Sequence, residues 1–379
     1  MREHRCFLGS VACSFTILLA LALVTTGTTE GRAEVLLYDE PFISDEYGQI
    51  LPAGVSSCQY TYRAGNEFEL EGLHSIAQEG DRDGEGESLR SNGDSYLVNL
   101  VGRLASGPCW DVAVRGDTAY MLDGGWLEIL DLSTPSVYVV LGRLAFPTNP
   151  KGISLYGNYA YVADEWSGLR VIDVSDPTNP VEVGFYDTPG CAIGVVVSGN
   201  YAYVADGGRG LRVIDVSDPI NPVEVGFYDT PGYAEGVSVS GGYAYIADGS
   251  RGLRVIDVSD PTNPVEVSFY YFDDIVEDVA ASGCYAYVVT DTLKMFAVID
   301  VSDPSNPVGV GYYNIFWSDA RSVVVSGSHA YLVGRGGLRV IDVSDPANPV
   351  GNGFHEMPGN GYNVSLYGCL LYTSPSPRD

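Results

Sequence analysis

LRVIDVSDPINPVEVGFYDTPG, residues 211–232, is the stretch that decides the fold, because the chain writes close relatives of it six times. The first aspartate of this phrase recurs at a spacing of 42 or 43 residues, at Asp131, Asp173, Asp215, Asp257, Asp300 and Asp342. Residues 168–190 and 210–232 are identical except that Thr178 is replaced by Ile220. A period of about 40 residues, filled with short β-type runs, predicts stacked repeats rather than one irregular core.

Each repeat predicts four short strands. In residues 194–232 the runs GVVVSG, YAYVADG, LRVIDV and VEVGFY are separated by turns rich in glycine and proline. The two prolines of SDPINP fix φ and lack an N–H group, so neither a helix nor a paired strand continues there. The β-branched and aromatic content predicts an all-β fold. Four antiparallel strands in each repeat fit the blade of a β-propeller.

The repeated text also resembles a known family. GLRVIDVSDPTNP, preceded by YAYVADG, resembles the LVIVD-repeat family of β-propellers, found in bacterial and archaeal secreted or surface proteins. The first copy departs from it at Thr134, and the fifth copy, LKMFAVIDVSDP, lacks the Gly-Leu-Arg start. The resemblance implies a fold and a secreted or surface location, and it implies no reaction.

The repeats predict a seven-bladed ring whose last blade is truncated. Six blades are expected to begin near Trp110, Lys151, Ala192, Ala234, Val276 and Ala320, and GYNVSLYG at 361–368 begins a seventh. An N-terminal strand commonly completes the last blade and removes exposed edges. We therefore expect residues 95–104 to supply the outer strand of blade seven, and we assign residues 95–368 to the propeller.

The N-terminal part of the chain lies outside the repeats. Residues 1–33 predict a signal peptide, with Arg2 and Arg5 before an apolar run at 6–24; a membrane anchor is the alternative. Residues 34–94 form an N-terminal extension or acidic linker. Asp81, Asp83 and Glu85 only weakly match a calcium loop, because an EF-hand needs a bidentate glutamate where Asn92 stands.

The C-terminal segment CLLYTSPSPRD, residues 369–379, interrupts the repeat. It resembles the translation of a sequencing adapter and is predicted to be a non-native tail, with a natural Ser/Pro-rich tail as the alternative.

Composition narrows the partners. The net charge of −29 predicts a protein that binds no nucleic acid. Because the signal peptide is expected to be cleaved, we predict an exported protein that does not span the membrane. Cys58, Cys109, Cys191 and Cys284 match no zinc spacing, and no metal or cofactor is predicted. Cys58–Cys109 is the only disulfide considered, and free thiols are the alternative.

Catalytic motifs are not found. The three histidines beyond the signal share no motif, so we predict that the chain is not an enzyme. The aspartates of the VIDVSD phrases, Asp173, Asp215, Asp257, Asp300 and Asp342, are expected to be structural acceptors of turn N–H groups. The arginines that recur in the third strand, Arg170, Arg212, Arg254 and Arg339, are expected to neutralise carboxylates across blades.

The blade-joining loops and the ADGGRG-type turns should share one face, and their sequences vary between copies. Aromatic and acidic residues there form the candidate ligand-binding site: Trp110, Trp166, Tyr233, Phe272, Asp274, Phe316, Trp317 and Asp319. Alternatively, these rings cap the hydrophobic ends between blades. Two functions stay open: a noncatalytic secreted or cell-surface module that binds protein or glycan, and an accessory binding module of a larger exported enzyme.

Overall fold

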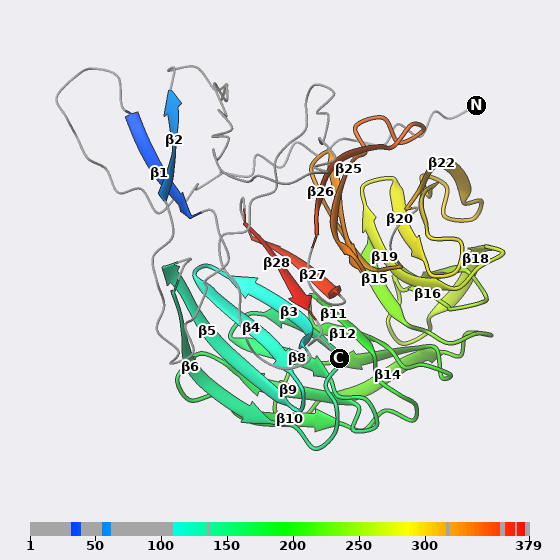
Figure 1. Cartoon of the computed structure of the whole chain (residues 1–379). Coiled ribbons are helices and arrows are strands. Elements are labelled where there is room, and N and C mark those ends of the chain that lie inside the picture. Colours follow the sequence, from blue (N-terminus) through cyan, green and yellow to red (C-terminus); the bar gives the residue numbers. More distant parts are fainter. Residues whose placement is uncertain are drawn as a thin grey trace. The chain divides into compact units, whose positions relative to one another are not determined.

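The computed structural model describes residues 32–38, 55–61, 109–134, 137–315, 319–356, 361–367 and 370–375. These residues form β-strands joined by turns and bends (Figure 1). Within this described part, no helix is long and apolar enough to cross a membrane. The weak calcium loop at residues 81–92 lies outside the described residues, as does the predicted signal peptide except for Arg32 and Ala33.

Two strands belong to the N-terminal extension. β1 (Arg32–Tyr38) pairs antiparallel with β2 (Val55–Thr61). They lie in a compact unit of their own, which comprises residues 13–104 and 133–137. The repeats form the other unit.

Six four-stranded antiparallel sheets, here called blades, follow in the described residues. Blade one contains β3 (Cys109–Arg115), β4 (Thr118–Asp123), β5 (Trp126–Thr134) and β6 (Val137–Ala145). Blade two contains β7 (Gly152–Tyr156), β8 (Tyr159–Ala163), β9 (Leu169–Asp173) and β10 (Val181–Tyr186). Blade three contains β11 (Gly194–Ser198), β12 (Tyr201–Ala205), β13 (Leu211–Asp215) and β14 (Val223–Tyr228).

The remaining blades repeat this order. Blade four contains β15 (Gly236–Ser240), β16 (Tyr243–Ala247), β17 (Leu253–Asp257) and β18 (Val265–Tyr270). Blade five contains β19 (Val276–Ser282), β20 (Tyr285–Thr290), β21 (Met295–Asp300) and β22 (Val308–Asn314). Blade six contains β23 (Ala320–Ser326), β24 (His329–Gly334), β25 (Gly337–Asp342) and β26 (Val350–His355). A final pair, β27 (Gly361–Tyr367) and β28 (Leu370–Pro375), forms a two-stranded sheet.

The first strand of each blade is its innermost strand. Successive first strands pack against one another from β3 through β7, β11, β15 and β19 to β23, and β27 contacts both β23 and β3. The prediction of an all-β propeller with four-stranded blades is confirmed. The described residues contain six such blades, so the predicted count of seven is not confirmed. That residues 369–379 are a non-native tail stays a prediction.

The hydrophobic core lies between neighbouring blades. Tyr161, Leu169 and Val171 of blade two pack with Val204 and Ile214 of blade three in one buried cluster. The second and third strands are therefore covered on both faces, which explains why LRVID is apolar almost throughout. Each fully buried aliphatic side chain stabilises the fold by about 1.5–3 kcal/mol relative to exposure.

The SDPxNP turns also join the blades. The Asp215 carboxylate accepts the Ser217 N–H at 2.9 Å, and the same bond recurs at Asp173, Asp257, Asp300 and Asp342. The carbonyl of Pro219, in the next turn along the ring, lies where a Cβ on Gly184 would stand. In the same way the Pro261 carbonyl lies against Gly226. The turn of the following blade thus docks at one position of the fourth strand, which is glycine in blades two and three and Ser268 in blade four.

Each outer strand of blades two to six contains a β-bulge. In blade three Val213 pairs with Gly226 and Ile214 with Glu224, so one residue of the outer strand has no partner. The same shift recurs in the other four blades. Bulges bend an edge strand and hinder pairing with another chain.

The cysteines differ from expectation. Cys109 is buried and free, so the proposed Cys58–Cys109 bridge is wrong. Its side chain is enclosed where β3 enters the propeller, and its Sγ donates to the Asp111 carbonyl at 3.5 Å. Cys191 is also free, whereas Cys284 is disulfide-bonded.

Candidate functional site

Seven residues mark the places where the chain enters the innermost strands, and we call them the inner ring. Register shifts in β3, β19 and β23 leave Trp110, Glu277 and Arg321 as the extra residues of β-bulges, and Tyr362 lies within a similar shift in β27. Bulges commonly re-aim side chains at functional sites. The inner ring comprises, in blade order, Trp110, Lys151, Ile193, Glu235, Glu277, Arg321 and Tyr362.

The remaining three ring residues directly precede β7, β11 and β15. The backbone N–H groups of Lys151, Ile193 and Glu235 donate to the last residue of the second strand of their own blades. All seven residues therefore occupy one structural position, on the face where the blade-joining loops enter.

One half of the inner ring is aromatic and cationic. The Lys151 Nζ lies 3.3 Å from the centroid of the Trp110 ring, and burial lowers the pKa of Lys151. The rings of Trp110 and Tyr362 lie 4.7 Å apart, tilted by 52°. The Arg321 guanidinium lies 5.3 Å from the Tyr362 ring centroid. Two cation–π contacts and one aromatic contact thus link four blade positions in a row.

The other half is acidic. Burial, followed by the neighbouring charge of Glu277, raises the pKa of Glu235 to about 7, and the charge of Arg321 opposes this. Burial also raises the pKa of Glu277, again opposed by Arg321. Among the described residues, neither carboxylate makes an ion pair or a hydrogen bond.

Two further carboxylates fasten the innermost strands beside the inner ring. Asp111 accepts the N–H of Val112 at 2.6 Å and that of Ile153, in the next blade, at 2.7 Å. Asp278 bonds Val279 at 2.8 Å and Val323, also in the next blade, at 3.0 Å. Burial raises the pKa of Asp111 to about 8 and that of Asp278 to about 6, while the amide hydrogen bonds pull both pKa values down.

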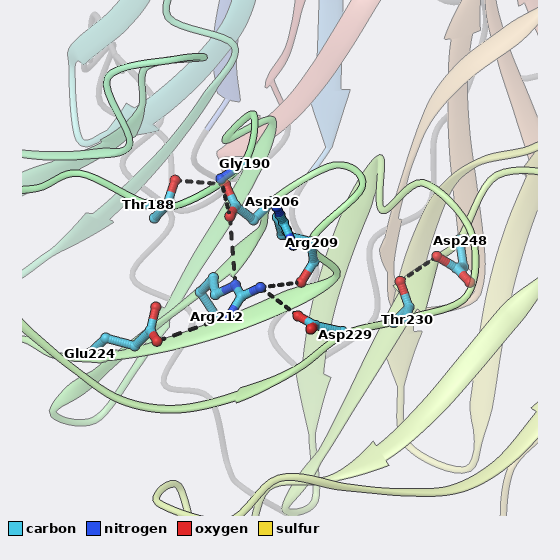
Figure 2. Close-up of polar contacts among 9 residues, drawn as sticks. All are labelled: Thr188, Gly190, Asp206, Arg209, Arg212, Glu224, Asp229, Thr230 and Asp248. Carbon is cyan, nitrogen blue, oxygen red and sulfur yellow. Dashed lines mark hydrogen bonds and ion pairs between the residues drawn. The ribbon is translucent and has the colours of Figure 1, made fainter.

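A buried network holds the blade-joining loops. Asp206, which follows β12, accepts the Thr188 hydroxyl at 2.6 Å and the Gly190 N–H at 2.8 Å (Figure 2). The Arg212 Nε lies 3.6 Å from Asp206 Oδ2, the oxygen that also accepts the Gly190 N–H. The Arg212 guanidinium also donates to the Arg209 carbonyl and to Asp229, at 2.8 and 2.5 Å. The loop that leads into the inner ring is therefore fixed to the blade it enters.

Arg170, Arg212 and Arg254 form ion pairs within blades rather than across them, which corrects the prediction; Arg339 forms no ion pair with a described residue, and its guanidinium lies 4.6 Å from the centroid of the Phe354 ring. Arg170 lies 4.0 Å from Asp164, 3.5 Å from Glu182 and 3.6 Å from Asp187, all in blade two. Antiparallel pairing places the third strand between the second and fourth strands of its own sheet, so its partners are local. Blades three and four repeat the arrangement, and the guanidinium of each lies 4.7–4.8 Å from the centroid of a phenylalanine ring on the outer strand.

Blades one and five have other residues in the positions of this arginine and its buried aspartate. In blade one Glu128 takes the place of the arginine, and its partner Arg143 on the outer strand lies 2.8 Å away. In blade five Ala297 takes that place, Thr290 replaces the buried aspartate, and the carboxylate comes from Asp274 in the loop.

Two predicted ligand-binding residues are buried instead. Phe272 is only 4% exposed and packs 5.0 Å from the Tyr270 ring, because it fills the core between blades four and five. The Asp274 carboxylate is already occupied by the N–H groups of Ile275, Thr292 and Leu293, at 2.8, 3.0 and 2.7 Å. Both side chains are thus occupied within the propeller, and their part in ligand binding stays a prediction.

The other predicted residues are scattered around the same face. Trp166 is 69% exposed and follows Glu165, which has a φ of 42°. Tyr233 is 42% exposed. Asp319 forms an ion pair with Lys294 at 2.9 Å. Phe316 and Trp317 lie outside the described residues.

Trp110 is thus the one predicted residue that belongs to the inner ring. Lys151, Glu235, Glu277, Arg321 and Tyr362 were missed. The one signal in the sequence that could have indicated these residues is that the position at the start of each innermost strand varies between repeats, whereas the phrases around it recur. In the described residues, no group of three or more His, Cys, Asp or Glu side chains is arranged to hold a metal ion.

The geometry defines a repeat β-propeller with a charged and aromatic inner ring. The chain belongs to the LVIVD repeat family, whose model matches residues 106–145, 149–188, 189–230, 231–271, 275–315 and 318–353. No curated protein matches the chain significantly.

Solved structures share the fold. The β-propeller domain of Cps50 (Swd1) from Myceliophteria thermophila is 14% identical, with a TM-score of 0.58 over 71% of this chain and 94% of that one. The structure of U3-55K is 9% identical, with a TM-score of 0.62 over 72% of this chain and 90% of that one. The computationally designed Ika8 protein is 7% identical, with a TM-score of 0.55 over 75% of this chain and 97% of that one. At these identities the likeness shows the propeller fold alone.

Proposed function

We propose that this chain is an exported, non-catalytic binding module that takes a protein ligand at the inner ring. The observation that carries the proposal is the row of bulges in the innermost strands, which present Trp110, Glu277 and Arg321 at one structural position. The surrounding loops are fixed by buried hydrogen bonds, so the ring is held ready for a ligand. Pre-organisation of this kind lowers the entropy that is lost on binding.

The contacts of the ring favour protein over glycan. Lys151 already covers the Trp110 ring, and Arg321 covers that of Tyr362. Sugars usually stack on open aromatic faces, whereas oppositely charged groups arranged around a ring suit the charged side chains of a protein.

Two further features support an exported module with a seventh blade. The disulfide at Cys284 suits an oxidising compartment, in agreement with the predicted signal peptide. Gly353 pairs with Val340 as Gly226 pairs with Val213, so β26 offers a docking place for the turn of a further repeat. The position of β27 between β23 and β3 suits the same arrangement.

The test is a peptide-display selection against the full chain. The variant Glu235→Lys/Glu277→Lys reverses the acidic half of the inner ring. The matched control Asp218→Lys/Asp260→Lys makes the same charge change in exposed turns at the opposite ends of the strands. Circular dichroism and thermal unfolding confirm that both variants fold.

Peptides that bind the wild type and the control, but not the inner-ring variant, are the expected result. If the inner-ring variant retains every selected peptide, the ligand does not bind at the inner ring and the proposal is wrong.

A further inference from the structure

The geometry points to one kind of ligand for the inner ring: a protein segment that carries a basic and an acidic side chain close together. The basic group lies between Glu235 and Glu277, and the acidic group meets Lys151 and Arg321. This inference rests on the proposed function and names the chemistry of its ligand.

The separation of charge around the ring is the first argument. Glu235 and Glu277 stand on neighbouring blades, and Ile193 separates them from Lys151. On the other side, Arg321, Tyr362, Trp110 and Lys151 follow one another through contacts between rings and cations. The ring therefore has an acidic arc and a cationic arc, with two carboxyl groups and two cations in all.

The second argument is that these four charges lack ion-pair partners among the described residues. Among the described residues, none of Glu235, Glu277 or Arg321 forms an ion pair within 4.0 Å, and neither does Lys151. By contrast, Arg212 of blade three lies within 4.0 Å of three carboxylates. Lys151, Glu235 and Glu277 are partly buried and Arg321 is exposed. Partly buried charges that are held apart gain most from a ligand that supplies the missing partners.

The third argument concerns position. The cations are held on aromatic faces, so they cannot readily collapse onto the glutamates across the ring. Asp111 and Asp278 already accept two amide N–H groups each, so they are not open acceptors for a ligand. The ligand is therefore recognised by the glutamates of one arc and the cations of the other. Because the two arcs differ in charge, a bipolar segment binds in one orientation.

The test uses end-blocked synthetic peptides with a fluorescent label. Their sequences contain one lysine and one glutamate separated by zero to three glycines, within a fixed Gly-Ser context. Matched peptides replace the lysine or the glutamate by glutamine. Affinity for the full-length protein is measured by fluorescence anisotropy at low ionic strength.

We expect at least one spacing to bind, and each glutamine peptide to bind about tenfold more weakly, since one charge-assisted hydrogen bond is lost. Glu277→Gln should weaken binding of the bipolar peptide and leave the affinity of the lysine-to-glutamine peptide unchanged. Arg321→Gln should show the same selectivity for the peptide's glutamate. Asp218→Asn, in an exposed turn, is the control and should change nothing.

Equal binding of bipolar and glutamine peptides overturns the inference. So does the absence of binding at every spacing. Neither outcome overturns the proposed function, which fails only if the inner-ring charge reversal leaves the display selection unchanged.

Discussion

Replacement of Asp206 by alanine should lower the free energy of unfolding by about 3–5 kcal/mol, because it leaves buried polar partners unsatisfied. The Asp206 side chain has no exposed surface. It accepts the Thr188 hydroxyl at 2.6 Å and the Gly190 N–H at 2.8 Å, and it lies 3.6 Å from the Arg212 Nε. Each hydrogen bond to a charged group contributes about 1.5–3 kcal/mol, so the loss of two accounts for this range.

The assay is urea unfolding of the full chain, followed by fluorescence and circular dichroism together to verify a single transition. Asp218→Ala is the matched control in the same blade, because that carboxylate is exposed and bonds only its own turn. The control should cost about 0.5–1 kcal/mol.

A double variant separates the buried charge from the hydrogen bonds. Arg212→Met combined with Asp206→Ala removes a guanidinium whose contact with Asp206 is already lost, although Asp229 and Glu224 stay beside it in the single variant. The double variant should therefore be more stable than the sum of the single effects predicts, by about 1 kcal/mol or more. The reasoning is refuted if Asp206→Ala costs no more than the control, or if the two single effects simply add.

Three further predictions follow from other contacts. Gly226→Val should destabilise the propeller by about 1–3 kcal/mol in the same urea assay, because its side chain would meet the Pro261 carbonyl; Gly226→Ser should cost less, since Ser268 occupies that place in blade four. Burial holds the pKa of Asp111 at about 8, above its unfolded value, so the associated stability is complete below about pH 4 and is lost as the pH rises to about 8. Unfolding at several pH values should show this decline, and Asp111→Asn should flatten it; an unchanged slope contradicts the assignment. Since the pKa of Glu235 is about 7, affinity for a basic peptide should rise through pH 7, and Glu235→Gln should reduce that rise; a flat profile in the wild type speaks against it.

The fold could be predicted because the same pattern of strands and turns recurs in each repeat. The spacing of the VIDVSD phrase fixes the blade, and the two prolines of SDPxNP fix the end of the third strand. The structure places all four strands of blade three within a residue or two of the apolar runs in the sequence. The docking of that turn on Gly184 could not be predicted, because it joins residues of different blades.

The candidate site was harder to predict for a physical reason. The sequence YYFDDIVE, residues 270–277, has the composition of an exposed loop. Val276 nevertheless pairs with Gly249 as Ala234 pairs with Gly207, so Asp274 stands where blades three and four have Gly190 and Gly232. In blade three the buried carboxylate follows the second strand and the hydroxyl lies in the loop. In blade five the hydroxyl of Thr290 follows the second strand, and the carboxylate of Asp274 lies in the loop and bonds it. Composition cannot reveal such an exchange, because it depends on which residues share a position.

The inner ring escaped prediction for the opposite reason. Its members have no common residue type, and a bulge in the innermost strand displaces several of them from the repeat pattern. Only alignment of the copies by strand register brings Trp110 and Arg321 into one column.

The differing polar pairs of the blades have a consequence for folding. Blades two, three and four carry the same arginine and carboxylates, so a strand that paired one repeat too early would still find suitable partners. Blade one instead offers Glu128 with Arg143, and blade five offers Ala297 beside Thr290. A third strand that slipped into blade one would place its arginine beside Arg143, and one that slipped into blade five would meet Thr290 in place of the buried aspartate. Either slip would exchange a favourable ion pair for a less favourable contact. The two atypical blades therefore bracket the interchangeable ones and determine which strand belongs to which sheet as the chain folds.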